Sequence, residues 1–497
     1  MRYKIIPRKK EMKLIYKTLL MLLLPVTVIA CYDDADFSSD ASLRLDFSSD
    51  EISFDTIFTE LASPSNGVMV YNRNSKALQI NTVELLGGSE SGFRVLVDGQ
   101  YGTLMHDFEL RSKDSLYLFA EVTPPANGAS APIVVEDVVR FTLASGVQQD
   151  IRLVAYGRDA EFMRAVTVNS DSTIKAGHYV VYDSLVVAPG AALTIEAGAI
   201  LYFHDKVPMV VRGSVVAAGT KEQPVVFRGD RTDNMFSYLP YDRVPGQWGG
   251  ITITATSNGN RFEHSDIHSA NYGIKVEPGD TTVQRLAMNG SRLENFYGHA
   301  LEMYQAHAMV TNTLVANAGG NCVKIVGGKA RFVHCTIANF FVYKVRDVAL
   351  TLHNSYGTTP APLYGADFVN CIVTGVKKDE LMGYLSNLGD TVPYCKNYHF
   401  ENSLINTVVG DDENFVNVRV DSSDEPPFAS DHFVKIDHDL FLYDFHLNET
   451  SPARSMGSDA FVSDPLLMYD KDGVLREPAS VDVGCYNYVN SDEEGAE

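Results

Sequence analysis

The sequence predicts an all-β protein in which a right-handed parallel β-helix follows an antiparallel β-sandwich. Two patterns predict this fold class. Short apolar runs recur about every eight residues between glycines in residues 182–230, and runs with period-two alternation fill residues 44–158. The first pattern is typical of a coil that repeats along the chain, and the second is typical of strands with one buried face.

Residues 182–230 contain the most regular part of the repeat. Leu185, Leu193 and Leu201 mark its step, and Gly190 and Gly198 stand at corners where the backbone turns sharply. Each apolar run is long enough for one short strand, and three such sides close a triangular coil. Stacked coils hydrogen-bond at a spacing of about 4.8 Å and bury an aliphatic interior. We therefore expect a β-helix over residues 165–440.

Later coils can be aligned on one aliphatic position that is expected to point inward. The coil length is roughly two dozen residues at first and then grows, which implies inserted loops that leave the helix. In this alignment Thr336 and Ala338 face outward, so Thr336→Asp should be tolerated. Trp248, in Trp-Gly-Gly-Ile, is expected to pack inside. The aligned residues are Ile267, Leu293, Leu314, Ile337, Ile372 and Leu404.

The segment 44–158 has a different character. It holds about seven predicted strands, including VMVYN, LQINTVEL and FRVLVDG, separated by turns such as Gly87-Gly88. This number of short alternating strands predicts an antiparallel sandwich of immunoglobulin type.

The first thirty residues have the features of a secretory signal. Seven Lys and Arg residues precede the run LLMLLLPVTVIA, which is too short for a lasting transmembrane helix. The run ends in VIAC, which resembles the lipobox of bacterial lipoproteins. The resemblance implies that residues 1–30 are removed and that Cys31 carries the lipid. An acidic tether, 31–43, would then join the membrane anchor to the fold.

Longer stretches resemble a family of Bacteroidetes surface lipoproteins. The acidic run Asp33-Asp34-Ala35-Asp36 resembles their export signal, and FDTIFTE, VYNRNS and LGGSESGFRVLVDG resemble their N-terminal module. PGAALTIEAGAILYF and QWGGI resemble their opening coils. The resemblance implies an outer-membrane lipoprotein exposed at the cell surface. The segment 441–497, with D-x-D-G-x-x-R, resembles a terminal element that caps the solenoid, followed by an acidic tail.

The charge of the chain limits which partners are expected, and its cysteine content limits which disulfides are expected. Without residues 1–30 the net charge falls from -22 to near -28, because that segment holds seven basic residues and one Glu. Nucleic acid is therefore not an expected partner. Five cysteines remain after lipidation, with no CxxC spacing. Most are expected to be buried, and Cys371 with Cys395 is the best candidate for a disulfide.

One group of ionisable residues follows from the coil alignment. If Ile267 and Leu293 point inward in adjacent coils, their neighbours stack outward. Two interpretations stay open for this outward patch: a proton-transfer site, or two solvent-exposed ion pairs contributing about 0–1 kcal/mol each. The patch consists of Asp266, His268, Arg292 and Glu294.

The inserted loops are the other candidate sites, because binding residues concentrate on loops held by a rigid scaffold. Residues 377–400 carry aromatic side chains suited to stacking on sugar rings or to loop packing: Tyr384, Tyr394, Tyr398 and Phe400. Residues 409–432 carry carboxylates, either calcium ligands or a solvated acidic face: Asp411, Asp412 and Glu413 among them. No other cofactor is expected.

Three functions remain open. The first is a non-catalytic surface lipoprotein whose β-helix binds glycan or another surface component. The second is a polysaccharide lyase or glycosidase, although the chain has only Gly298-His299-Ala300 where hydrolases of this shape carry Gly-His-Gly with clustered aspartates. The third is a structural or assembly role with a protein partner.

Overall fold

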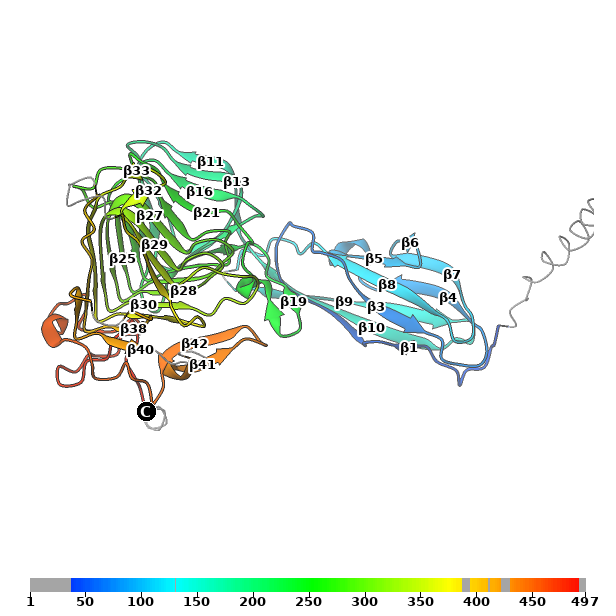
Figure 1. Cartoon of the computed structure of the whole chain (residues 1–497). Coiled ribbons are helices and arrows are strands. Elements are labelled where there is room, and N and C mark those ends of the chain that lie inside the picture. The colour runs from blue at the N-terminus through cyan, green and yellow to red at the C-terminus, as the bar shows by residue number, and fades with distance from the viewer. Residues whose placement is uncertain (1–36, 130, 387–393, 410–411, 422–429, 491–497) are drawn as a thin grey trace, which may run out of the picture. The chain divides into compact units, whose positions relative to one another are not determined.

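The strands of the chain form two separate units (Figure 1). The computed structural model describes residues 37–129, 131–386, 394–409, 412–421 and 430–490. One unit ends at Gly157, and the other begins at Arg158 and also takes Gly128–Ala131. The expected signal segment and Cys31 lie outside the described residues. Within the described residues, none of the helices is long and apolar enough to span a membrane.

The N-terminal unit contains two five-stranded sheets, in which neighbouring strands such as β3 and β8 or β9 and β10 pair antiparallel. The first runs in the order β1 (Asp46–Phe47), β3 (Asn66–Tyr71), β8 (Ser115–Val122), β5 (Phe93–Val97) and β6 (Gln100–Tyr101). The second runs in the order β2 (Glu51–Phe58), β10 (Gln148–Arg158), β9 (Ile133–Leu143), β4 (Leu78–Leu85) and β7 (Leu104–Leu110).

Both sheets contribute to one core. Val70 and Leu118 come from the first sheet, Ile80 and Phe141 come from the second, and all four are buried in the same cluster. Alternate residues of each strand point inward, as the period-two pattern predicts. The antiparallel sandwich is therefore confirmed, and its immunoglobulin type stays a prediction. Residues assigned to the tether take part in it, because Ser38 N donates to Ala77 O at 2.9 Å.

The C-terminal unit is a parallel β-helix. In the described part of the chain 26 of its strands form one continuous sheet, wound so that each coil contributes to three faces. Face A holds the first part of β13 (Gly177–Val187), β15 (Ala199–Phe203), β18 (Val225–Gly229), β23 (Ser265–His268), β26 (Arg292–Phe296), β28 (Leu314–Ala318), β30 (Thr336–Asn339), β35 (Ile372–Gly375), β38 (Leu404–Asn406) and β40 (Arg419–Asp421).

Two further faces complete the coils. Face B holds the second part of β13, β16 (Pro208–Val211), β21 (Gly250–Ile253), β24 (Ile274–Val276), the first parts of β27 (Leu301–Thr311) and β29 (Val323–Val333), β31 (Leu350–His353) and β36 (Leu381–Tyr384). Face C holds β12 (Ser172–Ile174), β14 (Ala192–Glu196), β17 (Ser214–Ala218), β22 (Asn260–Glu263), β25 (Leu286–Asn289), the second parts of β27 and β29, β34 (Leu363–Val369), β37 (His399–Glu401) and β39 (Phe415–Val416).

The β-helix opens with β11 (Glu161–Val168), slightly before the predicted start, and β11 begins faces A and B because it pairs with both parts of β13. Other elements of this unit stand outside the three faces. Three two-stranded pieces are attached to it: β19 (Asn234–Phe236) with β20 (Leu239–Pro240), β32 (Ser355–Tyr356) with β33 (Thr359–Pro360), and β41 (Phe433–Asp437) with β42 (Leu442–Leu447). The 3₁₀ turns are η1 (Gly88–Ser91), η2 (Tyr241–Arg243), η4 (Ser430–His432) and η5 (Asp459–Phe461).

The interior consists of columns of like side chains, one from each coil. Trp248 is fully buried, as predicted, and stacks on Phe203 with ring centroids 4.4 Å apart. On face C, Phe332, Phe368 and Phe400 stack with successive centroid distances of 4.9 and 4.7 Å. Phe400 is therefore a core residue, so its assignment as a ligand-binding candidate was wrong. The sequence did not reveal this position, because β37 is only three residues long and the two neighbours, His399 and Glu401, are half-buried.

The inward column on face A differs from the predicted alignment at three of six positions. The strands pair so that Ile267, Leu293, Val315, Ile337, Val373 and Ile405 form the column. Leu314, Ile372 and Leu404 each precede an inward residue and point out of the solenoid. The alignment failed there because both neighbouring residues are apolar, so alternation no longer marks the inner face.

The C-terminal segment explains why those outward residues are apolar. It was expected to cap the end of the solenoid, but β41 and β42 lie along face A, beside β30, β38 and β40 (Figure 1). Phe433, Phe445 and Val483 pack there against Leu314 and Ile372. The predicted boundary at residue 441 also falls between the two strands of this hairpin.

Polar contacts hold the same segment to the coils. Cys485 N donates to Thr336 Oγ at 3.1 Å, and Arg476 Nη2 donates to Asn312 Oδ1 at 2.8 Å. Thr336 and Ala338 face out of the solenoid, as predicted, but both are buried under the segment. The expectation that Thr336→Asp is tolerated was therefore wrong.

The cysteines contradict the proposed disulfide. All five within the described residues are free. Cys371 is buried, and its Sγ donates to Val369 O at 3.3 Å, whereas Cys395 Sγ donates to Leu363 O at 3.2 Å. Cys371 belongs to the solenoid core, whereas Cys395 is half-buried in a loop, so the two thiols lie in different environments.

Substitutions at the inner column test this register. Ile337→Asp buries a charge in an apolar column without a partner and should lower the free energy of unfolding by several kcal/mol, roughly 3–5. Thr336→Asp should also destabilise, by more than about 1 kcal/mol, since it places a charge under the apolar C-terminal segment. Lys329→Asp, at an exposed site on β29, is the matched control and should stay within about 0.5 kcal/mol. If denaturant melts show that Lys329→Asp lowers the free energy of unfolding as much as Ile337→Asp does, the assigned strand register is wrong.

Candidate functional site

The charged patch on face A forms as the sequence predicted. Asp266 pairs with Arg292 across adjacent coils, and His268 pairs with Glu294. Arg292 holds Asp266 with two hydrogen bonds, Nε to Oδ1 at 3.0 Å and Nη2 to Oδ2 at 2.6 Å. Arg292 Nη1 also lies 3.4 Å from Glu294 Oε2. The side chains thus form one connected network and not two separate pairs.

A residue that the sequence did not single out completes this network. Asp242 lies in η2, within the insertion between β18 and β21. His268 donates from Nδ1 to Asp266 at 3.0 Å and from Nε2 to Asp242 at 2.7 Å. Arg228 Nη2 reaches the same Asp242 oxygen at 2.9 Å. The insertion returns to the coil at Trp248, whose indole Nε1 donates to His268 O at 2.8 Å.

The centre of the network is buried and its edge is exposed, so the expectation of fully solvent-exposed ion pairs holds only at the edge: the side chains of Arg292 and Asp242 are 39% and 37% exposed. The His268 side chain is 6% exposed and that of Glu294 is 9% exposed. Burial alone would lower the pKa of His268, but Asp266 and Asp242 outweigh it and raise this pKa to about 9. Burial would raise the pKa of Asp242, yet His268 and Arg228 lower it to about 2. Burial raises the pKa of Glu294.

These charge states limit the chemistry of the patch. His268 is an imidazolium at neutral pH, and both ring nitrogens already donate to carboxylates, so it has no lone pair to accept a proton. Asp266 is occupied by Arg292 and His268. We therefore interpret the network as an ion cluster that fixes the 231–247 insertion to face A, not as a proton-transfer site.

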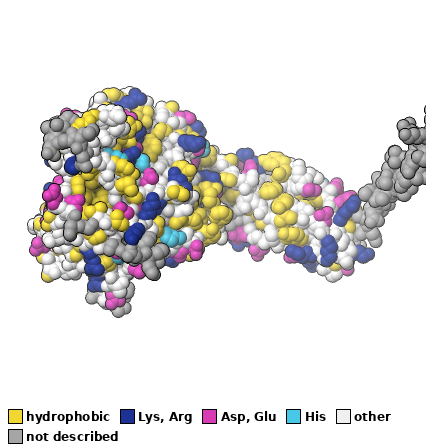
Figure 2. Space-filling model, in the orientation of Figure 1, with side chains coloured by type: hydrophobic (Ala, Val, Ile, Leu, Met, Phe, Trp, Pro, Cys, Tyr) yellow, Lys and Arg dark blue, Asp and Glu magenta, His cyan; other side chains and the backbone are white. Residues whose placement is uncertain are grey.

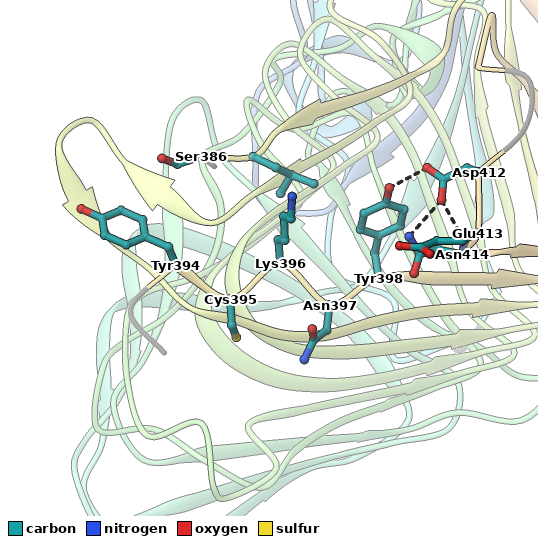
Figure 3. Close-up of a pocket in the computed structure, with 10 residues that line it drawn as sticks. Ser386, Tyr394, Cys395, Lys396, Asn397, Tyr398, Asp412, Glu413 and Asn414 are labelled. Carbon is teal, nitrogen blue, oxygen red and sulfur yellow. Dashed lines mark hydrogen bonds between the residues drawn. The ribbon is translucent and has the colours of Figure 1, made fainter. Parts of the chain in front are cut away.

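A second group of candidate residues lines a cavity of about 960 Å³. Tyr394 and Tyr398 come from one inserted loop, and Asp412 and Glu413 from the next (Figure 3). The structure thus brings two of the four predicted aromatic residues together with two of the three predicted carboxylates. The lining is completed by Leu385, Ser386, Cys395, Lys396, Asn397 and Asn414.

Hydrogen bonds fix one wall of this cavity. Tyr398 OH donates to Asp412 Oδ2 at 2.6 Å, while Asn414 N and Nδ2 donate to Asp412 Oδ1 at 2.8 and 2.9 Å. Figure 3 shows Lys396 and Tyr398 on one side of their segment and Cys395 and Asn397 on the other. Burial and the bond to Asp412 raise the pKa of Tyr398 to about 12, so the hydroxyl stays protonated.

The same contacts bear on the calcium hypothesis. Both Asp412 oxygens already accept hydrogen bonds, and Asp411 lies outside the described residues. Among the described residues, no three His, Cys, Asp or Glu side chains gather in a way that suits a metal ion. The contacts of Asp412 instead explain its role as the anchor that joins two loops.

Tyr384 lies at a different place from the other tyrosines. It stands on face B at the end of β36, where its ring stacks on His353 with centroids 4.6 Å apart and an interplanar angle of 14°. Together with Lys324, Thr351 and Met382 it lines a cavity of about 290 Å³. Leu385 and Ser386, the next two residues, line the larger cavity, so the two cavities share one segment of chain.

Face B also carries a polar cluster that sequence reasoning missed. Glu302 Oε1 accepts from Lys324 Nζ at 2.9 Å and from Tyr304 OH at 2.5 Å, and it lies 3.7 Å from His299 Nε2. Burial, together with Lys324, lowers the pKa of His353 to about 4, so this ring is neutral. Glu302 and Lys324 pair directly across β27 and β29. An alignment of these two strands in the sequence would therefore have predicted that the two side chains meet.

Comparison with known proteins identifies the solenoid. A family model described as a pectate-lyase-like β-helix domain matches residues 166–282. Protein bark beetle of Drosophila melanogaster is 22% identical over 233 residues, which is 42% of this chain but only 7% of that protein's length. Residues 166–282 are thus similar to a pectate-lyase-like β-helix domain, in agreement with the parallel β-helix of the structure.

Two solved structures share less with this chain. A family 123 glycoside hydrolase from Clostridium perfringens has 7% identity and a TM-score of 0.18, covering 24% of this chain and 30% of its own. The ASH/PapD-like domain of human CEP192 has 11% identity and a TM-score of 0.17, covering 26% of this chain and 94% of its own. At these scores neither structure says anything about function.

The His268 network makes stability depend on pH. The pKa of His268 rises from 6.5 in the unfolded chain to about 9 in the fold. The stability that His268 contributes is therefore fully present below pH 6.5 and is lost as the pH rises through 9. We expect a loss of roughly 3 kcal/mol over this interval, measured by denaturant melts. His268→Gln should remove that part of the decline. His307→Gln is the control, because burial lowers the His307 pKa and its contribution has the opposite sign. An unchanged decline in His268→Gln would refute the assigned charge state.

Proposed function

We propose that this protein is a lipoprotein of the outer membrane, exposed at the cell surface, that binds a glycan through its β-helix without converting it. The N-terminal sequence supports the anchor, since a basic segment and an apolar run end in VIAC at Cys31. The β-helix supports the binding role, because its coils present long rows of outward side chains on a rigid frame.

The cavity between the two inserted loops is the observation that carries the glycan proposal. Its volume of about 960 Å³ suits a ligand of several rings. Tyr394 and Tyr398 offer aromatic faces, on which the apolar faces of sugar rings stack. Lys396, Asn414 and Glu413 offer the donors and acceptors that hydroxyl groups require.

Face B extends the same surface. Tyr384, whose ring stacks on His353, directly precedes Leu385 in the chain, and the neutral imidazole of His353 suits an uncharged hydroxyl group better than an ion. Successive coils repeat at about 4.8 Å, so a chain of sugars lying along the helix axis would meet a new row of side chains at each coil.

Surface charge favours a neutral or weakly acidic glycan. The chain after the signal carries a net charge near -28, which repels polyanions. Figure 2 shows Lys and Arg mixed with Asp and Glu on the visible face of the β-helix, with no broad basic patch there. Nucleic acid remains outside the proposal for the same reason.

A glycan array with the mature protein tests binding, and substitutions then locate it. For the best ligand, Tyr394→Ala and Tyr398→Ala should each weaken affinity by about tenfold, because each removes one stacking face. Tyr101→Ala is the control, since Tyr101 is an exposed tyrosine of the sandwich. Failure to bind any glycan would reject the proposal and favour an assembly role with a protein partner. Equal affinity in all three variants would place binding elsewhere.

The Glu302 cluster favours a second candidate function, a polysaccharide lyase or glycosidase. A carboxylate, a lysine, a tyrosine and a histidine meet there, beside the cavity of about 290 Å³ on face B. These are groups used in acid–base catalysis. Release of reducing ends or unsaturated products from a bound glycan, lost in Glu302→Gln, would establish turnover and reject the non-catalytic proposal.

The anchor has its own test, because a single residue supplies the acylated thiol. Cys31→Ser should abolish incorporation of radioactive palmitate and leave the precursor uncleaved. Replacement of Asp33, Asp34 and Asp36 by Ala should retain the label but lower accessibility to protease added to intact cells. Palmitate label in Cys31→Ser would show that the lipoprotein assignment is wrong.

A further inference from the structure

A smaller cavity of about 190 Å³ lies on face A, beside the His268 network and under the C-terminal segment. Four nitrogen-bearing side chains from separate parts of the chain converge on it. Lys221 comes from the loop after β17, His264 from the turn after β22, Arg292 from β26, and Lys471 from the C-terminal turn. The coils thus form part of the cavity wall, and the C-terminal segment completes it.

The two carboxylates in the wall are already neutralised. Asp266 is held by Arg292 at 2.6 Å and by His268 at 3.0 Å. Asp472 is held by His446 at 2.9 Å and by Lys471 at 3.2 Å. Each carboxylate therefore faces two positive groups, and neither leaves negative charge to spare for a cation.

Two nitrogen groups are left without such partners. Among the described residues, neither the Lys221 ammonium nor the His264 ring has a hydrogen bond or an ion pair. The Thr220 hydroxyl accepts from Gln223 N at 3.1 Å, which leaves its own hydrogen to donate. The cavity therefore holds unused donors and positive charge next to carboxylates that are already paired.

Glycines bring these groups close together. Gly473 has a φ of +81°, and a Cβ there would lie 3.0 Å from Lys221 Nζ. Gly290 has a φ of +60°, and a Cβ there would lie 2.6 Å from His264 Cε1. Left-handed backbone at both positions favours glycine, and the missing side chains leave room for the two nitrogen groups at the cavity.

We propose that this cavity binds a tetrahedral oxyanion, sulfate or phosphate, either free or as an ester on a larger ligand. Lys221 supplies the unpaired positive charge. Arg292 and Lys471, whose charges are matched by Asp266 and Asp472, add N–H donors that those ion pairs leave unused, and Thr220 and His264 supply neutral hydrogen bonds. At about 30 Å³ per water, the volume admits one such group with a few waters. The site lies on face A, so it does not depend on the glycan proposal for face B.

Calorimetric titration of the mature protein with sodium sulfate and with sodium phosphate, at constant ionic strength, tests the proposal. We expect one saturable site for at least one anion. Lys221→Ala should weaken it at least tenfold without changing the melting temperature of the free protein, because the Lys221 side chain is exposed. Lys206→Ala, an exposed lysine in another turn, is the matched control and should bind as the wild type does.

A second pair of titrations separates the sources of the anion. A sulfated oligosaccharide that binds more tightly than its desulfated form, and that loses this advantage in Lys221→Ala, identifies an ester ligand. Equal affinity for both forms, with free anion still bound, identifies a free-ion site. Absence of saturable binding to sulfate, phosphate and the sulfated oligosaccharide, or equal affinity in Lys221→Ala and Lys206→Ala, overturns the proposal.

Discussion

Parallel pairing of one coil on the next is the constraint on which the rest of this structure depends. Because the strands are in register, a residue and its counterpart in the following coil lie about 4.8 Å apart and point the same way. The inner columns become continuous apolar rows, such as the one through Ile267, Leu293 and Ile337. The outer columns bring side chains together that are more than twenty residues apart, and both Asp266 with Arg292 and Glu302 with Lys324 arise in this way.

The faces differ in what covers these outer columns. Along face A the C-terminal segment buries Leu314, Thr336 and Ile372, so both sides of the sheet are apolar over several coils. Nearer the start of the solenoid the 231–247 insertion covers charged residues, which must be paired because burial of a lone charge is costly. The ion network around His268 follows from this cover, and it joins the insertion to the coils through Asp242.

Sequence patterns predicted the features that depend on local periodicity. They did not predict the features that depend on contacts between distant segments of the chain. The opening coils and the pairing of Asp266 with Arg292 follow from spacing, and the buried Trp248 follows from its Trp-Gly-Gly-Ile context. The register failed at Leu314, Ile372 and Leu404, because a second covering layer makes both strand faces apolar. Asp242 and Lys221 gave no signal, since each sits in a loop whose position is set by tertiary contacts. Phe400 was misassigned because a three-residue strand carries too little alternation to reveal its inward side.

The chemistry of the molecule therefore concentrates where the regular coil receives an addition. A bare coil offers a flat, repeating surface, whereas an inserted loop or a returning segment creates concavity and places a second set of groups opposite the first. The cavity of Tyr394, Tyr398 and Asp412 needs two insertions, and the cavity of Lys221 and Arg292 needs the C-terminal segment. Both kinds of addition can change in length without disturbing the inner columns, because the strands that carry those columns pair independently of them. The fold thus fixes where a cavity can form, and the additions decide which side chains line it.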